Sequence, residues 1–301
     1  MEAPSAPPAP TRRRALTVTL ATAAAVIAAP AGVAAASPAT VGRPSRPRPL
    51  RHAHAHNDYL HPRPLHDALA HGFTSVEADI FLVDGELLVA HDPAGLDPSR
   101  TLAGLYLEPL RALARAGHGS VHPHHRRPLQ LLIDIKADGV AAYRELDRQL
   151  TRHGSLFTRC HHGRVRPGAV TAVISGDRAA RVPMEAQRTR LAFYDGRLDD
   201  LGTASPASFT PLISANWTQT FGWLGAGPFP RAERDRLRTL VSTAHREGRR
   251  IRFWATPDLP GPEREAVWSE LMAAGVDHLN TDDLAGLERF LRARTGVAPT
   301  P

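Results

Sequence analysis

The stretch Thr74-Ser75-Val76-Glu77-Ala78-Asp79-Ile80-Phe81-Leu82 combines β-branched and aromatic residues with two acids spaced two apart, and it predicts a β-strand. Side chains two residues apart share one face of a strand, so Glu77 and Asp79 project together while the apolar residues face the other way. Carboxylates packed side by side repel each other unless a cation or water lies near them. We therefore expect a charged pocket on one face of this strand and a hydrophobic core on the other.

Seven further segments have the character of strands, and helix-like stretches separate most of them. Strands that alternate with helices indicate a parallel sheet, and eight such strands indicate an α/β fold of one domain, the (β/α)8 or TIM barrel. The predicted strands are 51–56, 74–82, 129–136, 169–175, 190–194, 210–215, 249–255 and 276–280. The predicted helices are 65–71, 105–116, 139–153, 231–247 and 263–274.

Chemically active side chains follow several of these strands. His56 ends the first strand, and Asp134 and Lys136 end the third. The turn at residues 83–86 predicts a hairpin, which would return His91 to the side of the second strand. TIM barrels place their active sites at the C-terminal ends of the strands. Three acids, two histidines and a lysine in one such pocket are suited to metal-assisted cleavage of a phosphate ester.

The lysine is informative because arginine supplies the other basic residues. The chain has 37 lysines and arginines, and Lys136 is its only lysine. A compact ammonium group differs from a planar guanidinium, and a crowded site that contains a metal and a phosphate distinguishes the two. Its position two residues after Asp134, on the same strand face, favours a functional role for this lysine.

The N-terminal segment has the features of a secretory signal. Arg12-Arg13-Arg14 precedes an apolar run from Ala15 to Ala29, and small residues follow near Ala34-Ala35-Ala36. We therefore predict a signal peptide over 1–36, exported by the general or the twin-arginine route, then a flexible Pro/Arg-rich linker over 37–50. The barrel domain is predicted over 51–296. The protein would thus be secreted or extracytoplasmic.

Composition limits the partners of the chain. The formal net charge of +7 indicates a solvated basic surface, and peripheral contact with anionic lipid is the alternative that it leaves open. No basic stripe interleaved with aromatic residues is present, so we expect no nucleic-acid binding. Cys160 is the only cysteine, which excludes an internal disulfide. We expect a monomer.

The motifs together resemble the phospholipase-C-like phosphodiesterase superfamily, which includes glycerophosphodiester phosphodiesterases and sphingomyelinases D. The closer likeness is to bacterial proteins related to the fungal altered-inheritance-of-mitochondria family. The resemblance covers roughly Arg51 to Phe290. The motifs that carry it are His54–Tyr59, Ser75–Ile80, Leu88–Asp92, Asp134–Lys136, Phe193–Leu198, Phe253–Asp258 and Asn280–Leu284.

The resemblance implies a role for each matching residue. His56 and His91 match the general acid/base histidines, and Lys136 matches the accompanying lysine. Glu77, Asp79 and Asp134 match the acidic metal ligands, whose oxygen atoms suit Mg²⁺ or Ca²⁺ rather than zinc. The implied reaction is hydrolysis of a phosphodiester in a glycerophosphodiester or a phospholipid. The attacking group is either water or a hydroxyl of the substrate, which would give a cyclic phosphate.

One departure from the superfamily concerns substrate contacts. Glycerophosphodiester phosphodiesterases have His-Arg at the first position, where this chain has His56-Asn57, so a phosphate-binding arginine is missing there. Asn57, Trp254 and His54 are the candidate substrate contacts. The substrate preference of that branch therefore does not transfer to this chain.

Two other functional classes remain open. His52-x-His54 or His54-x-His56 is similar to the paired metal ligands of metallo-amidohydrolases, although the fifth and sixth strands supply no further histidine. A secreted barrel that binds an anionic ligand without turnover is the third class. Aspartates at the starts of loops are more often helix caps than catalytic groups, and this applies to Asp195, Asp282 and Asp283.

Overall fold

The structure is a computed structural model that describes residues 47–123 and 125–295. The predicted signal peptide lies outside the described residues, so export remains a prediction, as does most of the linker. No helix within the described ranges combines the length and the apolar character that crossing a membrane requires.

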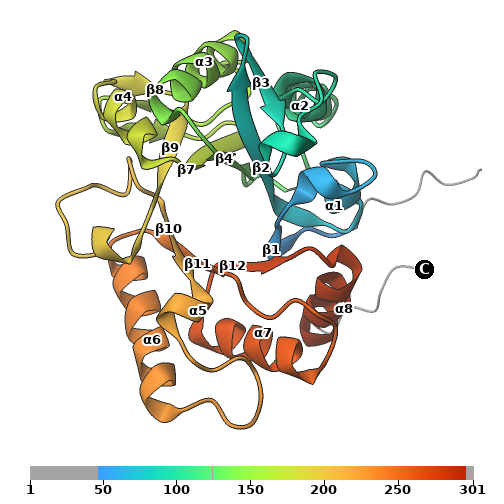
Figure 1. The fold of residues 1–301 in the computed structure, drawn as a ribbon, viewed down its shortest axis with the longest axis vertical. Helices are drawn as coiled ribbons and strands as arrows, with labels where there is room; N and C mark the ends of the chain where they lie inside the picture. The colour runs from blue at the N-terminus through green and yellow to red at the C-terminus, as the bar shows by residue number, and fades with distance from the viewer. Residues whose placement is uncertain (1–46, 124, 296–301) are drawn as a thin grey trace, which may run out of the picture. The chain divides into compact units, whose positions relative to one another are not determined.

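Within the described residues, eight parallel strands close into a barrel with helices packed around it (Figure 1). In order around the barrel they are β1 (Leu50–Ala55), β2 (Phe73–Val83), β4 (Leu129–Ile135), β7 (Val170–Gly176), β9 (Ala192–Gly196), β10 (Leu212–Asn216), β11 (Arg250–Trp254) and β12 (His278–Thr281). Pairing of β12 with β1 closes the ring. Each predicted strand overlaps one barrel strand, which confirms the predicted TIM barrel.

The helices cover the outside of the barrel. They are α1 (His66–Ala70), α2 (Glu108–Ala116), α3 (Gly139–Arg152), α4 (Arg181–Glu185), α5 (Trp217–Thr220), α6 (Arg231–Arg246), α7 (Pro262–Ala274) and α8 (Leu284–Thr295). Short turns of 3-10 helix are η1 (Asp58–Leu60), η2 (Pro93–Gly95), η4 (Arg178–Ala180) and η5 (Leu198–Asp200), and η3 (Ala103–Leu107) is π-helical. All five predicted helices are present, whereas α4, α5 and α8 were not predicted.

The predicted hairpin is also present. Strand β3 (Glu86–Val89) pairs antiparallel with the end of β2, and Val83 opposes Glu86 across a two-residue turn. Both turn residues have positive φ, 50° at Asp84 and 84° at Gly85, as this kind of tight hairpin requires. The backbone N–H of Ala90 then donates to the carbonyl of Asp79 at 3.2 Å. This bond fixes the segment that leads directly into His91.

A small antiparallel sheet was missed by the sequence analysis. It consists of β5 (Arg159–His161), β6 (Arg164–Arg166) and β8 (Thr189–Arg190). Strands of two or three residues are too short to show an alternating hydrophobic pattern. Cys160 of β5 is fully buried.

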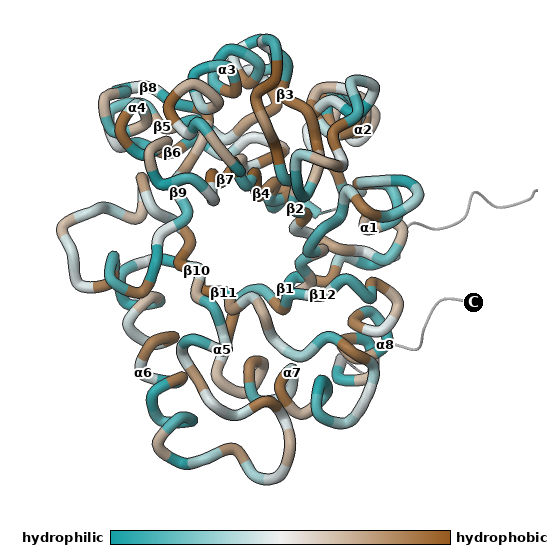
Figure 2. The backbone as a smooth tube through the Cα atoms, in the orientation of Figure 1, coloured by the Kyte–Doolittle hydropathy of each residue, from teal (hydrophilic) through white to brown (hydrophobic). Residues whose placement is uncertain are grey.

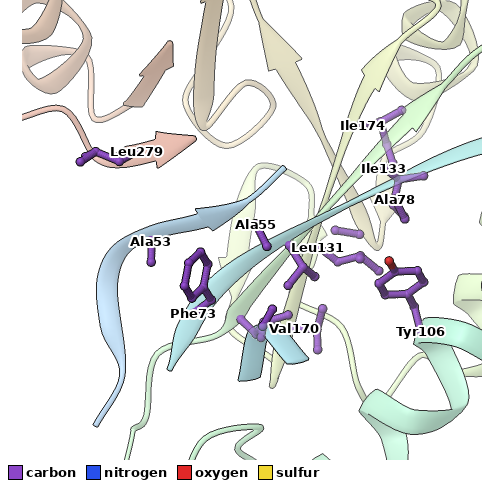
Figure 3. Packing of buried hydrophobic residues seen from close by; sticks show 14 of the residues in the cluster. Ala53, Ala55, Phe73, Ala78, Tyr106, Leu131, Ile133, Val170, Ile174 and Leu279 are labelled. Carbon is purple, nitrogen blue, oxygen red and sulfur yellow. The ribbon is translucent and has the colours of Figure 1, made fainter. Parts of the chain in front are cut away.

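The two faces of the barrel strands pack differently. Ala78, Ile133 and Ile174 are register neighbours on β2, β4 and β7, and they lie side by side and fully buried in Figure 3. They belong to the main hydrophobic cluster, which also contains residues of the surrounding helices. Fully burying an isoleucine side chain contributes roughly 1.5–3 kcal/mol. The helices change between brown and teal along their length in Figure 2, as expected when one side of a helix is buried.

The opposite, inward face carries a second, smaller apolar cluster. Leu132, Val173, Phe193 and Leu212 of the barrel strands form this cluster together with Cys160 of the small sheet. Inward positions two residues further along these strands are polar, so the barrel interior changes from apolar to charged toward the C-terminal ends. The outward packing of Val76, Ala78 and Ile80 confirms the face assignment made from the sequence.

Candidate active site

The predicted acids of two strands meet at the C-terminal mouth of the barrel. Asp79 of β2 is the register partner of Asp134 of β4, which in turn is the partner of Ser175 of β7. Because neighbours in a parallel sheet share a face, the three side chains form one row that faces into the barrel. Lys136 comes directly after β4, two residues beyond Asp134 and on the same face.

Asp79 is the centre of a dense set of hydrogen bonds. Its carboxylate is buried, and Oδ2 accepts from the hydroxyl of Tyr59 at 2.6 Å and from Nδ1 of His91 at 3.2 Å. Nζ of Lys136 lies 2.7 Å from the same oxygen. The other oxygen, Oδ1, is buried and has no hydrogen-bond partner among the described residues. One oxygen of Asp79, Oδ2, therefore has three partners, and the other, Oδ1, has none among the described residues.

Lys136 links the two strands electrostatically. Its Nζ also lies 3.2 Å from Oδ1 of Asp134. Burial alone would lower the pKa of this lysine, but the charges of Asp134 and Asp79 outweigh it and raise the pKa. The pKa of Asp134 is raised to about 6, because burial and the charges of Asp79 and Glu77 outweigh the opposing charge of Lys136. The row of acids thus has more negative charge than Lys136 balances.

Glu77 has a different environment, although it lies only two residues before Asp79. Its Oε2 accepts from Nη1 of Arg252 at 2.8 Å and from Nε2 of His54 at 2.9 Å. Burial acts to raise the pKa of Glu77, but the charge of Arg252 and the bond from His54 hold it well below its usual range. Arg252 is itself buried, and its Nε donates to Oγ of Ser214 at 2.8 Å. This ion pair spans the barrel interior.

His54 of β1 holds Glu77 through the hydrogen bond to its carboxylate. It is fully buried, its Nδ1 lies 2.6 Å from Oγ of Ser75, and Ser75 in turn accepts from Gln130 at 2.8 Å. Burial lowers the pKa of His54 to about 4, so the ring is neutral at ordinary pH. With both ring nitrogens in hydrogen bonds, His54 holds Glu77 in place rather than offering a nitrogen to the mouth.

His56 forms a pair with an acid from the last strand connection. Its Nδ1 lies 2.9 Å from Oδ1 of Asp282, and Nδ2 of Asn57 lies 3.3 Å from Oδ2 of the same carboxylate. Burial would lower the pKa of His56, but the hydrogen bond with Asp282 and nearby negative charges raise it. Asn57 has φ of 47°, a left-handed conformation that asparagine tolerates well. The amide and the imidazole therefore share one carboxylate.

His91 is the most exposed member of the site. Its side chain is 63 % exposed, and its only carboxylate contact among the described residues is Asp79. The hydroxyl oxygen of Tyr59, whose proton is donated to Asp79, also lies 3.4 Å from Nδ1 of His91 and 2.8 Å from Oδ1 of Asn57. Tyr59 thus connects the two histidine regions of the mouth.

Trp254 lies apart from this network. It ends β11 as the register partner of Asn216 and is half-buried. Within the described residues, no hydrogen bond or ring contact joins it to the histidines or the acids. Its place at the barrel mouth agrees with the predicted location.

Three residues of the network were missed or misjudged from the sequence. Tyr59 stands in the quoted motif, but no role was assigned to it. Arg252 was overlooked, although the alternation of Arg250, Arg252 and Trp254 with Ile251 and Phe253 places it on an inward face. Asp282 was interpreted as a helix cap, and its contact with His56 corrects that interpretation.

A metal ion would bind to these acids through oxygens that accept no hydrogen bond. Both hydrogen bonds described for Glu77 go to Oε2, and those of Asp79 go to Oδ2, so each acid has a second oxygen outside these bonds. Within residues 47–123 and 125–295, no three His, Cys, Asp or Glu side chains are gathered closely enough to hold a metal by themselves. The buried, unpartnered Oδ1 of Asp79 and the excess of carboxylates nevertheless fit a hard divalent cation in chemistry and charge.

Comparison with known proteins gives two family matches. A model described as "AIM6-like phosphodiesterase domain" matches residues 48–195, and one described as "Glycerophosphoryl diester phosphodiesterase family" matches residues 250–285. The two matched segments contain every residue of the network except Ser214. The expected superfamily likeness is thereby supported.

Curated relatives are fungal proteins rather than the bacterial ones expected from the sequence. Altered inheritance of mitochondria protein 6 homolog from Arthroderma benhamiae is 30% identical over 256 residues, which cover 77% of this chain and 81% of the relative. Altered inheritance of mitochondria protein 6 from Eremothecium gossypii is 29% identical and covers 80% of this chain and 69% of the relative. The protein of that name from Saccharomyces cerevisiae strain S288c is 27% identical, with 77% and 68% covered.

Proposed function

This chain belongs to the family of altered inheritance of mitochondria protein 6, and from that premise we propose that it is a metal-dependent phosphoric diester hydrolase. Its substrate would be a glycerophosphodiester or a phospholipid. The family models that match the chain are named for phosphodiesterases, which supports the reaction class.

One observation carries the proposal. Each of two histidines at the barrel mouth has its Nδ1 beside a carboxylate, His56 at 2.9 Å from Asp282 and His91 at 3.2 Å from Asp79. A carboxylate that accepts from Nδ1–H fixes the ring tautomer and leaves Nε2 as the nitrogen that exchanges a proton. Two such histidines, one for each proton transfer, are what an in-line displacement at phosphorus needs.

Two proton transfers accompany the displacement at phosphorus. One histidine takes a proton from the attacking oxygen as it forms a bond to phosphorus. The other gives a proton to the ester oxygen as its bond to phosphorus breaks, so an alcohol leaves. If the attacker is water, the second product is a phosphomonoester; if it is a hydroxyl of the substrate, the product is a cyclic phosphate. Each histidine is worth roughly 10²–10⁴-fold in rate.

The remaining residues stabilise negative charge. Glu77, Asp79 and Asp134 are the proposed ligands of Mg²⁺ or Ca²⁺, which would need further oxygen ligands besides these three side chains. When bound, the ion would polarise a non-bridging phosphate oxygen. Lys136 adds a positive charge beside the same acids, and Tyr59 keeps Asp79 oriented through its 2.6 Å hydrogen bond. Asn57 and Trp254, both at the mouth, are the proposed substrate contacts.

The amidohydrolase alternative has weaker support. Nδ1 of His52 lies 3.2 Å from the carbonyl oxygens of Val276 and Asp277, and both nitrogens of His54 are already in hydrogen bonds. His54 belongs to both candidate histidine pairs, and neither of its nitrogens is free for a zinc ion. The non-catalytic alternative is less favoured because both histidine–carboxylate pairs are complete.

The test is a metal panel with the purified protein. Release of p-nitrophenol from bis-p-nitrophenyl phosphate, dependent on Mg²⁺ or Ca²⁺ and abolished by a chelator, is the expected result. Hydrolysis of glycerophosphodiesters and lysophospholipids under the same conditions would then identify the substrate. Amide turnover with zinc would replace the proposal by the amidohydrolase function. If the protein binds the diester but does not turn it over with any metal, the non-catalytic binding function would replace the proposal.

A further inference from the structure

Two arginines lie at the barrel mouth beside β7 and β9, two strands that supply no residue to the proposed reaction. Arg178 begins η4, just after β7, and Arg197 follows β9. Nη1 of Arg178 donates to the carbonyl oxygen of Asp195 at 2.8 Å, and Nη1 of Arg197 lies 3.3 Å from the same oxygen. The two guanidinium groups therefore converge on one point at the C-terminal end of β9.

Both guanidinium groups are held in place by the fold. Arg178 lies over the ring of Tyr194, with its guanidinium carbon 4.2 Å from the ring centroid. Arg197 donates to Oδ2 of Asp195 at 2.9 Å and to Oγ of Ser175 at 3.2 Å. Their side chains are nevertheless 40 % and 32 % exposed, so part of each planar donor group faces solvent.

The acids near this pair already have other partners. Asp195 already accepts from Ser175 and Ser214 as well as from Arg197. The ion pair of Arg178 with Asp200 is long, 3.8 Å, whereas Arg181 makes a 2.9 Å contact with that same acid. Burial and the charge of Arg197 both lower the pKa of Arg178, as expected for two cations close together. An added anion would relieve this repulsion.

The location of the pair relative to the acids limits what it contacts. Ser175, which Arg197 contacts, is the register partner of Asp134. Strand β7 lies between β4 and β9, and neighbouring strands are about 4.8 Å apart, so the backbone of β9, on which the pair converges, is about 10 Å along the wall from β4. The pair is therefore placed beside the region of Lys136, where it can contact a group next to a phosphate bound there.

We propose that Arg178 and Arg197 form an anion-binding subsite for a second acidic group of the substrate, next to the phosphodiester that is cleaved. The proposal rests on the proposed diesterase function and narrows its substrate to diesters whose alcohol part carries a carboxylate or a phosphate. Guanidinium groups suit such ligands because their planar donors match carboxylate and phosphate oxygens.

The test compares three substrates that share one leaving group. These are the p-nitrophenyl phosphodiesters of glycolic acid, ethylene glycol and choline, which differ only in an anionic, neutral or cationic group. The wild-type protein is expected to show the highest kcat/KM for the glycolate ester. The ratio of kcat/KM for glycolate over ethylene glycol should fall roughly ten- to a hundredfold in Arg178→Gln and in Arg197→Gln. Arg178→Lys keeps the charge and should keep part of the preference.

Arg181→Gln is the matched control. Arg181 lies over the same Tyr194 ring at 5.2 Å, but it is paired with Glu185 and Asp200 and lines a separate surface cavity of about 560 Å³. The ratio should not change in this variant. If Arg197→Gln does not fold because Asp195 loses its partner, Arg178→Gln, which removes no short ion pair, decides the question.

The outcomes separate the two proposals. A glycolate preference that disappears with Arg178 supports the subsite. Turnover of all three esters without a charge preference, or a preference lost only in Arg181→Gln, overturns the subsite and leaves the diesterase function standing. No turnover of any ester with Mg²⁺ or Ca²⁺ overturns both.

Discussion

Glu77 and Asp79 lie two residues apart on one face of β2, yet their surroundings differ. The contacts of Glu77 mainly support the fold, whereas those of Asp79 belong to the proposed reaction. Glu77 is held from inside the barrel by buried Arg252 and neutral His54. Asp79 is held from the mouth by Tyr59, Lys136 and the exposed His91.

These separate partners show that two neighbouring carboxylates in one pocket each have their own positive charge. The guanidinium beside Glu77 is buried and shares its donors with other strands, so it balances a fixed charge in the barrel. The ammonium beside Asp79 is 24 % exposed, lies between two acids and leaves Oδ1 of Asp79 free. Changes around Glu77 should therefore mainly affect folding, and changes around Asp79 should mainly affect turnover.

The largest expected effect is at the mouth. His56→Ala and His91→Ala should each lower kcat for bis-p-nitrophenyl phosphate by roughly 10²–10⁴-fold, because each removes a general acid or base. The free energy of unfolding of His91→Ala should change little, since His91 is 63 % exposed. His66→Ala, on the exposed side of α1, is the matched control and should be fully active. Near-normal turnover in either test variant would remove the acid/base assignment.

The next effect is on folding. Arg252→Met should lower the free energy of unfolding, measured with urea, by about 3–5 kcal/mol, because it leaves the buried charge of Glu77 without its partner. Arg231→Met is the matched control: that side chain is 95 % exposed, and its ion pair with Asp235 should be worth about 0–1 kcal/mol. Adding Glu77→Gln to Arg252→Met should restore part of the loss. Equal stability of Arg252→Met and wild type would show that the folded protein does not depend on Arg252 to balance the charge of Glu77.

The Glu77 region also predicts a pH effect on stability. The folded-state pKa of His54 is about 4, below its ordinary 6.5, so the unfolded chain binds the proton more readily. Stability from this group is complete above about pH 6.5 and falls as the pH drops toward 4, by up to about 3 kcal/mol. His54→Gln should weaken that slope relative to wild type. Asp58, with a pKa of about 7, contributes the opposite slope equally to both proteins, so the difference between them isolates His54.

Lys136→Arg keeps the positive charge between Asp79 and Asp134 and tests whether turnover depends on the shape of the cation. The ammonium lies 2.7 Å from Asp79 and 3.2 Å from Asp134, a space in which a guanidinium would have to displace one acid. We expect kcat to fall about 10²-fold, as it does when one stabilising donor is lost. Lys136→Met should be at least as impaired. If the arginine variant is active and the methionine variant is not, charge alone is sufficient and the shape argument fails.

The sequence predicted the barrel and the acids because both depend on local patterns. Alternation along β2 and β4 identified the inward face, and spacing of two placed Glu77 with Asp79 and Asp134 with Lys136. Arg252 was missed because its partner Glu77 is 175 residues away, and no local pattern identifies which acid a distant inward arginine meets.

The same limit applies to the contacts of Asp282 and to the shortest elements. Asp282 lies 226 residues from His56, and barrel closure between β12 and β1 brings the two together. An aspartate at a loop start looks like a helix cap in sequence, so its pairing with a histidine became visible only with the fold. The short strands of the small sheet carry too few residues for a periodic signal.

The smallest expected effect identifies the role of His56. The hydrogen bond that His56 donates to Asp282 raises the pKa of His56 against the effect of burial, so Asp282→Asn should lower that pKa. If His56 is the base, the acidic limb of the kcat/KM profile will move to lower pH; if it is the acid, the basic limb will move to lower pH. Asp283→Asn is the matched control, because Asp283 pairs with Arg264 instead of a histidine and should shift neither limb. A profile of Asp282→Asn that is unchanged, or that moves to higher pH, would show that Asp282 does not set the proton affinity of His56.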